Sequence, residues 1–166
     1  AVNNPRALDE ARTKNIRGSM AKKTPSTRSD YSVFSTITTR WFDNDVYGHM
    51  NNTIHYQLFD TAVHGYLVGQ GVLDFKSGPT VFLVVETGCK YFSELAFPDI
   101  VSAGIRVQKL GTSSVIYDVG LFKGEDNAAA AEGFFVHVNV DRATRRPLKI
   151  HPQTKMVLTK LMNLVG

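Results

Sequence analysis

Hydrophobic positions follow two different periods along the chain. Within residues 53–69 they recur every three to four positions, which predicts one long α-helix that begins at Asn51 or Asn52 and ends at Gly69. Elsewhere apolar and polar residues alternate, as is typical of strands. The expected strands are residues 32–42, 80–92, 99–110, 113–123 and 128–141, and helical spacing returns over residues 152–165.

The segments between the expected strands are short and rich in turn residues. Phe97-Pro98-Asp99, Gly111-Thr112 and residues 124–127 separate consecutive strands. Connections this short join antiparallel neighbours. One helix followed by an antiparallel sheet predicts an α+β fold. Because the apolar stripe of the helix is wide, we expect the sheet to cover the helix on most sides.

The charge of the chain is unevenly distributed. The 166 residues carry a formal net charge of +4, and residues 1–30, with seven Lys/Arg and three acids, account for all of it. The remainder is neutral overall, which argues against a nucleic-acid-binding face. We expect residues 1–30 to form a flexible basic tail and residues 31–166 to form a single domain. Gly18-Ser19-Met20 resembles a cloning remnant before a native start, so residues 1–19 are either vector-derived or native tail.

Several functional classes lack their sequence signature here. No apolar run approaches the roughly 20 residues of a membrane span, and no phosphate-binding loop is present. The single cysteine, Cys89, excludes an intramolecular disulfide and fits a reducing compartment, so the expected location is cytoplasmic. The five histidines show no zinc-binding spacing, so we expect neither a metal nor another cofactor. His64 is predicted to be a core or interface side chain, and Cys89 to be buried and unreactive.

The polar segment 41–52 runs directly into the start of the predicted helix. A helix N-terminus presents unpaired N–H groups and the positive end of the helix dipole, which can polarise a carbonyl oxygen. Gly48 permits a tight turn that brings Asp45 over this end, whereas Asp43 is expected to orient the loop. Such a carboxylate suits acyl transfer to water, as general base or as nucleophile. The alternative is that both acids are ordinary turn residues and the asparagines only cap the helix.

The loop and the helix after it resemble the 4-hydroxybenzoyl-CoA thioesterase-like (YbgC/FcbC-type) acyl-CoA thioesterases. The shared pattern is Asp43-x-Asp45-x-x-Gly48-His49-Met50-Asn51-Asn52-x-x-x-Tyr56-x-x-x-Phe59-Asp60. It continues through Val85-Glu86-Thr87, Tyr91-Phe92, Pro98-Asp99 and Gly111-Thr112-Ser113-Ser114, and covers roughly residues 33–145. The resemblance implies the hot-dog fold, in which an antiparallel sheet wraps around a long helix.

The resemblance also implies roles for residues of the loop. Asp45 matches the family's catalytic aspartate, and Asn52 matches the residue whose backbone N–H polarises the thioester carbonyl, with Gly48 making the turn between them. His49 either assists proton transfer or orients the loop. In this family acyl-CoA lies between two subunits, which implies a homodimer or homotetramer. The residues expected to contact the substrate are Asn51, Ser113, Ser114, Lys109 and Glu86.

The expected substrate-contact residues were chosen for different reasons. Ser113 or Ser114 matches a serine near the CoA nucleotide, Lys109 belongs to the basic groups suited to CoA phosphates, and Glu86 is either paired in the core or faces the substrate cleft. The residues after Gly48 differ from those of the benzoyl-CoA enzyme, so its aromatic specificity is not implied. Two alternatives remain open: an acyl-CoA-binding sensor or assembly module without turnover, and an enoyl-CoA hydratase that pairs Asp45 with His49.

Overall fold

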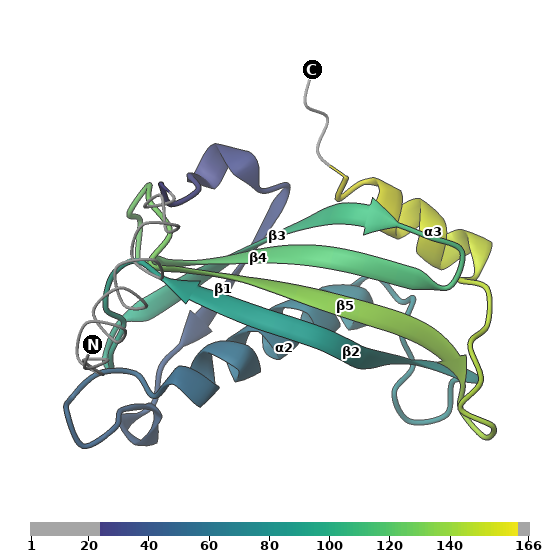
Figure 1. Cartoon of the computed structure of the whole chain (residues 1–166), viewed down its shortest axis with the longest axis horizontal. Helices are drawn as coiled ribbons and strands as arrows, with labels where there is room; N and C mark the ends of the chain where they lie inside the picture. The colour runs from purple at the N-terminus through teal and green to yellow at the C-terminus, as the bar shows by residue number, and fades with distance from the viewer. Residues whose placement is uncertain (1–23, 163–166) are drawn as a thin grey trace, which may run out of the picture.

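The computed structural model describes residues 24–162 of the chain, and Figure 1 shows one long helix lying against a sheet of long strands. In chain order the elements are the 3-10 turn η1 (Arg28–Asp30), β1 (Val33–Thr38), the 3-10 turn η2 (Trp41–Asp43), α2 (Asn52–Gly69), β2 (Thr80–Tyr91), β3 (Ile100–Leu110), β4 (Ser114–Lys123), β5 (Ala131–Asp141) and α3 (Pro152–Thr159).

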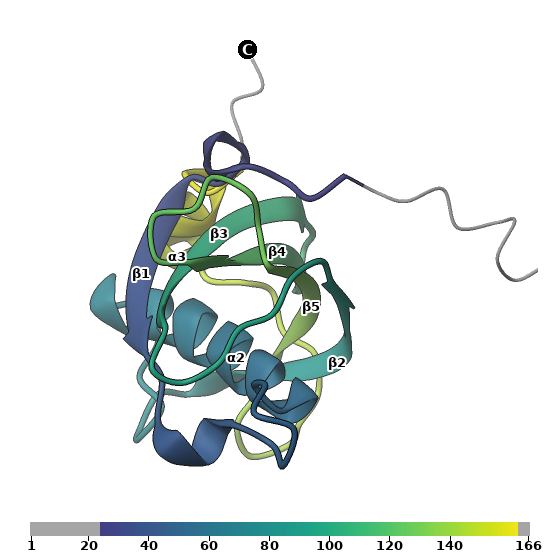
Figure 2. The same cartoon turned by 90° about the vertical axis from the view of Figure 1, so that its left-hand side faces the viewer.

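The five strands form one antiparallel sheet in the order β1-β3-β4-β5-β2. β3, β4 and β5 follow one another through short turns, whereas β1 and β2 occupy the two edges. Register shifts between Val84 and Glu86 in β2 and between Val107 and Lys109 in β3 interrupt the ladders. Such bulges bend a sheet, and Figure 2 shows the sheet curving over α2. The α+β hot-dog architecture is thereby confirmed.

Helix α2 lies on the inner face of the sheet. Its buried residues are Ile54, His55, Leu58, Phe59, Ala62, Val63 and Leu67. The Phe59 ring lies directly on Gly133 of β5, where a Cβ atom would collide with it, and 6.0 Å from the Phe135 ring. Burial of each large apolar side chain contributes about 1.5–3 kcal/mol. Because Gly133 has no side chain, the Phe59 ring can lie directly against β5, and this contact sets how closely α2 approaches the sheet.

The opposite face of α2 is exposed in the single chain. Gln57, Asp60, Thr61 and Val68 lie on it, so the expectation that the sheet covers the helix on most sides is wrong. A curved sheet of five strands covers one side of a helix and does not close around it. Within the described residues, no helix is long and apolar enough to cross a membrane.

Three expected boundaries are also corrected. The strand expected over residues 32–42 ends at Thr38, because the chain then folds into η2. The strand expected over 128–141 begins at Ala131, and the C-terminal helix runs over Pro152–Thr159, with residues 163–165 outside the described part. In β5 the alternating apolar residues Phe134, Val136 and Val138 point away from α2 and are half-buried, since the intervening residues face the helix.

Replacement of Gly133 by alanine is expected to weaken the packing of α2 against the sheet. The new Cβ meets the Phe59 ring, and overpacking of a core typically costs about 1–3 kcal/mol. Gly65→Ala is the matched control, because Gly65 lies in α2 with no atom near the added Cβ, and alanine there should stabilise by about 0.5–1 kcal/mol. Urea unfolding of both variants tests this, and equal midpoints for Gly133→Ala and the parent would contradict it.

Candidate functional site

The loop between β1 and α2 is organised around the buried side chain of Asp43. Its carboxylate accepts hydrogen bonds from the backbone N–H of Arg40 (2.7 Å) and from Nε and Nη2 of the same arginine (3.0 and 2.8 Å). Its backbone carbonyl accepts from the Asn51 N–H at 2.8 Å. Asp43 therefore joins the end of β1 to the residue before α2, which confirms that it orients the loop.

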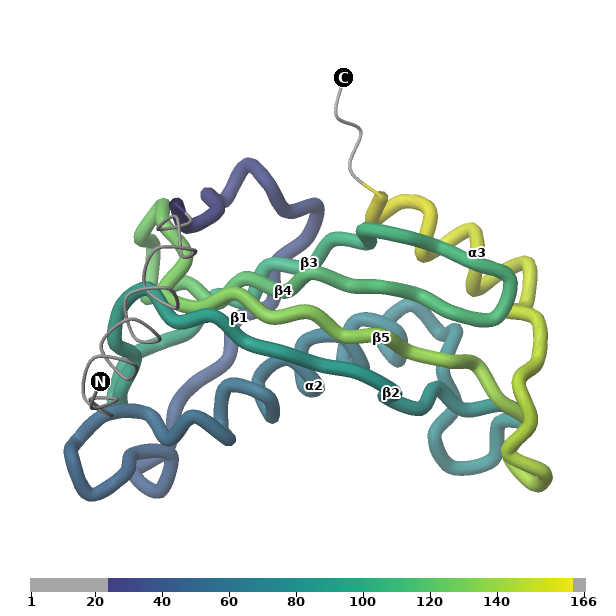
Figure 3. The backbone as a smooth tube through the Cα atoms, in the orientation of Figure 1, coloured from purple at the N-terminus to yellow at the C-terminus, as the bar shows by residue number. Residues whose placement is uncertain are grey.

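Two further contacts fix the loop to the segment after β2. The Asn44 side-chain oxygen accepts from the backbone N–H of Phe97 at 2.8 Å. The Met50 N–H donates to the Leu95 carbonyl at 2.7 Å, and both side chains are buried. The loop thus lies beside the end of β2, as the backbone tube of Figure 3 shows.

Asp45 lies at the inner side of a tight turn. Its Oδ1 accepts from the backbone N–H groups of Tyr47 (2.8 Å) and His49 (3.3 Å), and its own N–H donates to the His49 carbonyl at 2.7 Å. Gly48 adopts a φ of 83°, a conformation that favours glycine. The turn predicted at Gly48 is therefore present. It leaves the second carboxylate oxygen of Asp45 without a hydrogen bond from any described residue.

The N-terminus of α2 carries the donor that the resemblance assigns. Asn51 is the N-cap, and its side-chain oxygen accepts from the Thr53 N–H at 3.0 Å, while its carbonyl accepts from the Ile54 N–H at 2.9 Å. Asn52 is the first helical residue, and no hydrogen bond from its N–H is found within residues 24–162. This N–H lies at the positive end of an 18-residue helix.

Asp45 and Asn52 line the same pocket, which has a volume of ≈340 Å³. The lining residues are Asp45, His49, Met50, Asn52, His55, Tyr91, Ser93, Glu94 and Leu95. Met50 and Leu95 provide an apolar base, whereas the rim is polar. The structure thus brings together the carboxylate and the helix end that the sequence singled out.

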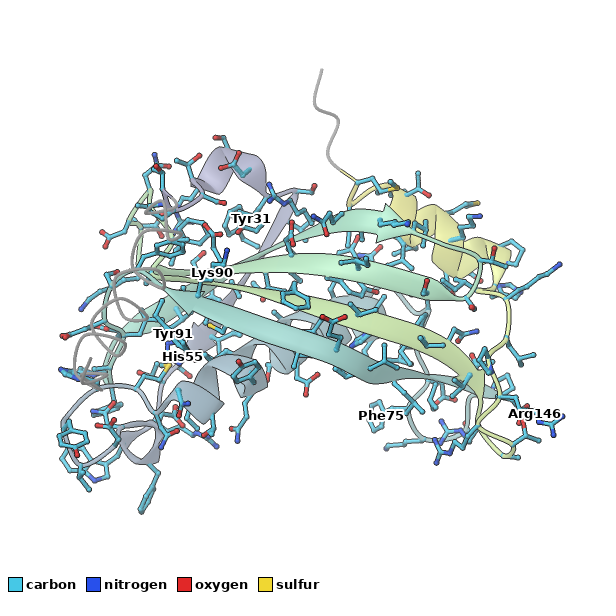
Figure 4. The ribbon with its side chains drawn as sticks, in the orientation of Figure 1. Tyr31, His55, Phe75, Lys90, Tyr91 and Arg146 are labelled. Carbon is cyan, nitrogen blue, oxygen red and sulfur yellow. The ribbon has the colours of Figure 1, made fainter. Side chains whose placement is uncertain are left out.

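His55 and Tyr91 are pocket residues that sequence reasoning missed. Their rings meet edge to face at 4.9 Å, and Figure 4 shows them side by side where α2 and β2 meet. His55 Nδ1 lies 3.3 Å from the Asn51 carbonyl, and burial lowers the pKa of this imidazole. Desolvation raises the pKa of the Tyr91 hydroxyl, so it stays protonated at neutral pH. The sequence signal was the position of His55 one turn after Asn51, on the buried stripe.

The side chain of His49 lies next to Glu94 and not next to the carboxylate of Asp45. Its Nε2 lies 3.3 Å from Glu94 Oε2, whereas His49 contacts Asp45 through its backbone N–H and carbonyl. Glu94 is mostly exposed and was not singled out by the sequence. The ring of His49 therefore lies at the rim of the pocket, and its position fits loop orientation better than proton transfer with Asp45.

Four expected substrate-contact residues lie away from the pocket of their own chain. Ser114 is opposite Val138, which is opposite Leu83, eight residues before Tyr91 along β2. At about 3.3 Å per residue this separates the β3–β4 turn from the pocket by about 26 Å. That turn also carries Ser113 and follows Lys109, whereas Glu86 pairs with Val136 on the outer face of the sheet.

Two reactive or charged side chains outside the pocket are occupied or protected. Arg142, a basic residue just after β5, donates to the backbone carbonyls of Gly78, Asp74 and Phe75. Cys89 is partly rather than fully buried, and desolvation raises the pKa of its thiol to about 11, which disfavours the nucleophilic thiolate.

The pocket combines three elements of acyl transfer. A carboxylate oxygen that accepts no hydrogen bond from residues 24–162, a backbone donor at a helix end and an adjacent apolar base can together hold a carbonyl group next to a proton acceptor or nucleophile. No metal is required by this arrangement.

The chain matches known proteins along most of its length. A family model described as the thioesterase-like superfamily matches residues 39–158. The PA5185 protein of Pseudomonas aeruginosa strain PAO1 is 43% identical, with a TM-score of 0.83, over 86% of this chain and 99% of that chain. No curated protein sequence matches at a significant level.

Two thioesterases share the fold at low identity. A DHNA-CoA thioesterase from Staphylococcus aureus is 18% identical, with a TM-score of 0.69, over 76% of this chain and 88% of that chain. A 1,4-dihydroxy-2-naphthoyl-CoA thioesterase from Synechocystis is 14% identical, with a TM-score of 0.70, over 77% and 96%. With the family model spanning residues 39–158 and a 43% identical relative of the same fold, the chain belongs to the thioesterase-like superfamily.

Proposed function

We propose that the protein hydrolyses an acyl-CoA thioester to the free acid and the CoA thiol. The single observation that carries this proposal is the shared pocket of the Asp45 carboxylate and the unpaired N–H of Asn52 at the start of α2. Membership in the thioesterase-like superfamily supports the same reaction class. CoA as the thiol is supported by two structural neighbours whose names give CoA thioesters as substrates.

In the proposed reaction the thioester carbonyl oxygen accepts a hydrogen bond from the Asn52 N–H. The negative charge that develops on this oxygen is stabilised by the helix dipole, and one such donor typically contributes about 2.7–4 kcal/mol to the transition state. The acyl chain then lies against the apolar base formed by Met50 and Leu95.

Asp45 acts on the carbonyl carbon by one of two routes. As general base it takes a proton from water while the water oxygen bonds to carbon, and the C–S bond then breaks to release the thiolate, which gains a proton. As nucleophile its carboxylate oxygen bonds to carbon and expels the thiolate, and water hydrolyses the resulting mixed anhydride. The free oxygen of Asp45 serves either route.

We further propose that a second copy of the chain completes the pocket. Around the loop, Trp41, Phe42, Val46 and Tyr47 are 72–94% exposed, an apolar surface that a monomer rarely leaves uncovered. The exposed edge strand β2 lies next to the pocket. Ser113 and Ser114, about 26 Å away in one chain, would approach the pocket only from a partner, as would Lys109 on β3. A homodimer or homotetramer fits these features.

Replacement of Asp45 tests the reaction directly. Asp45→Asn keeps the shape of the side chain but removes its proton-accepting and nucleophilic oxygen, so kcat should fall by about 10²–10⁴-fold. The measurement is thiol release from a panel of acyl-CoAs. Asp126→Asn is the matched control, since Asp126 is an exposed acid in the β4–β5 turn, and it should keep full activity.

Two outcomes would count against this proposal. Full turnover by Asp45→Asn would remove the assigned role. Stoichiometric binding of intact acyl-CoA with negligible thiol release by the parent protein would instead favour a binding module.

Replacement of Asp43 should separate loop structure from chemistry. Asp43→Ala leaves the N–H of Arg40 without its acceptor, and such a loss typically costs about 1–3 kcal/mol. We therefore expect Asp43→Ala to lower both the melting temperature and kcat, whereas Asp45→Asn lowers kcat alone. Thermal unfolding followed by circular dichroism measures the difference. An Asp43→Ala protein as stable as the parent would refute the anchoring role.

Cys89 is expected to be dispensable. Because its thiol has a raised pKa of about 11 and lies outside the pocket, Cys89→Ser should retain the parent's kcat. Alkylation of the folded protein by iodoacetamide at neutral pH should also be slower than alkylation of the urea-unfolded chain. A large loss of turnover in Cys89→Ser would point to a cysteine nucleophile instead.

A further inference from the structure

One cluster of metal-binding side chain types lies outside the candidate pocket. Asp60 and His64 project from α2, and His137 projects from the inner face of β5. One potential ligand atom from each residue lies within 4.8 Å of the other two, and no other group of this kind occurs within residues 24–162. Asp60 lies eight residues after Asn52, which places the cluster about 12 Å further along the helix axis.

The buried member of the cluster has no hydrogen-bond partner. His137 is fully buried, and neither of its ring nitrogens has a partner among the described residues. Aromatic rings of Phe82, Tyr117 and Phe135 surround it. An unsatisfied buried polar group costs about 1–3 kcal/mol, so a side chain in this position needs a ligand or an explanation. The neighbouring side chain with a ring nitrogen is His64, with ring centroids 5.2 Å apart.

The other two members present their donors at the spacing that a metal requires. Residues four apart on a helix share one face, and His64 Nδ1 lies 3.4 Å from Asp60 Oδ1 and 3.0 Å from the Asp60 backbone carbonyl oxygen. Two ligands about 2.0–2.1 Å from a tetrahedral zinc ion are themselves about 3.3–3.4 Å apart. The side chains of Asp60 and His64 are 53% and 35% exposed, so both can adjust and solvent can supply a further ligand.

We propose that Asp60, His64 and His137 form a binding site for a divalent transition-metal ion of the zinc type. Two imidazole nitrogens and one carboxylate oxygen are a donor set that zinc accepts, with a water molecule as fourth ligand. The ion displaces the proton that His64 shares with Asp60 and occupies a lone pair of His137. It thereby links α2 to β5 and stabilises the folded protein.

This proposal departs from the expectation of no metal that the sequence suggested. Sequence motifs detect ligands at fixed spacing, and His64 and His137 are brought together only by the packing of α2 on β5. The site is independent of the proposed hydrolysis, because the pocket at Asp45 contains none of its three residues.

The test is metal binding by the untagged, metal-free full chain. Titration with Co²⁺ should give the visible absorption of a tetrahedral site, saturating at one ion per chain, and Zn²⁺ should displace it and raise the melting temperature. Asp60→Asn and His64→Gln should each weaken Zn²⁺ binding by at least about tenfold. Both positions are partly exposed, so these variants should fold even if His137→Gln does not.

His151→Asn is the control, since His151 caps α3 outside the cluster and asparagine can keep that cap. It should bind Co²⁺ and Zn²⁺ as the parent does. Absence of the tetrahedral Co²⁺ spectrum together with an unchanged melting temperature in Zn²⁺ would overturn the proposal. Parent-like binding by both Asp60→Asn and His64→Gln would overturn it equally.

Discussion

The contact between the Phe59 ring and Gly133 is the constraint on which the remaining structure depends. It sets how closely α2 approaches β5 at the middle of the helix. The N-terminus of α2 lies where it does because the helix is held along its apolar stripe and capped by Asn51. An 18-residue helix held in this way directs its positive end to one side of the sheet, next to the end of β2.

Two acids of the preceding loop have different surroundings, which fit a structural role for Asp43 and the proposed chemical role of Asp45. Asp43 is buried and fully used by Arg40, so it holds the loop against the helix. Asp45 accepts hydrogen bonds from the turn at Gly48 through one oxygen, lines the pocket, and accepts none through its other oxygen from the described residues. A rigid anchor next to a partly free carboxylate is the arrangement that positions a catalytic group without consuming its lone pairs. The sequence predicted that Asp43 orients the loop and that Asp45 lies at the helix end, and the surroundings of the two side chains give the physical reason for this difference.

The fold was predictable wherever local period and short turns determine it. The helical period gave α2 to within one residue, and the turn residues between strands gave an antiparallel sheet. Contacts between residues far apart in the sequence could not be predicted from the hydrophobic period or the turn residues. Strand β1 ends early because Asp43 captures the N–H of Arg40, and the pairing of His55 with Tyr91 depends on the packing of α2 against β2. In β5 the more continuous apolar alternation, Phe134, Val136 and Val138, lies on the outer face, whereas the face on the helix also carries His137, so the pattern could not show which face meets the helix.

The proposed hydrolysis requires a thioester carbonyl bound at the Asn52 end of α2 beside Asp45. The most direct measurement is a crystal structure with an acyl-CoA analogue in which a methylene group replaces the thioester sulfur. The carbonyl oxygen should lie about 2.7–3.1 Å from the backbone nitrogen of Asn52, with the Asp45 carboxylate against the carbonyl carbon. A carbonyl bound elsewhere, or an Asp45 carboxylate turned away from it, would contradict the account.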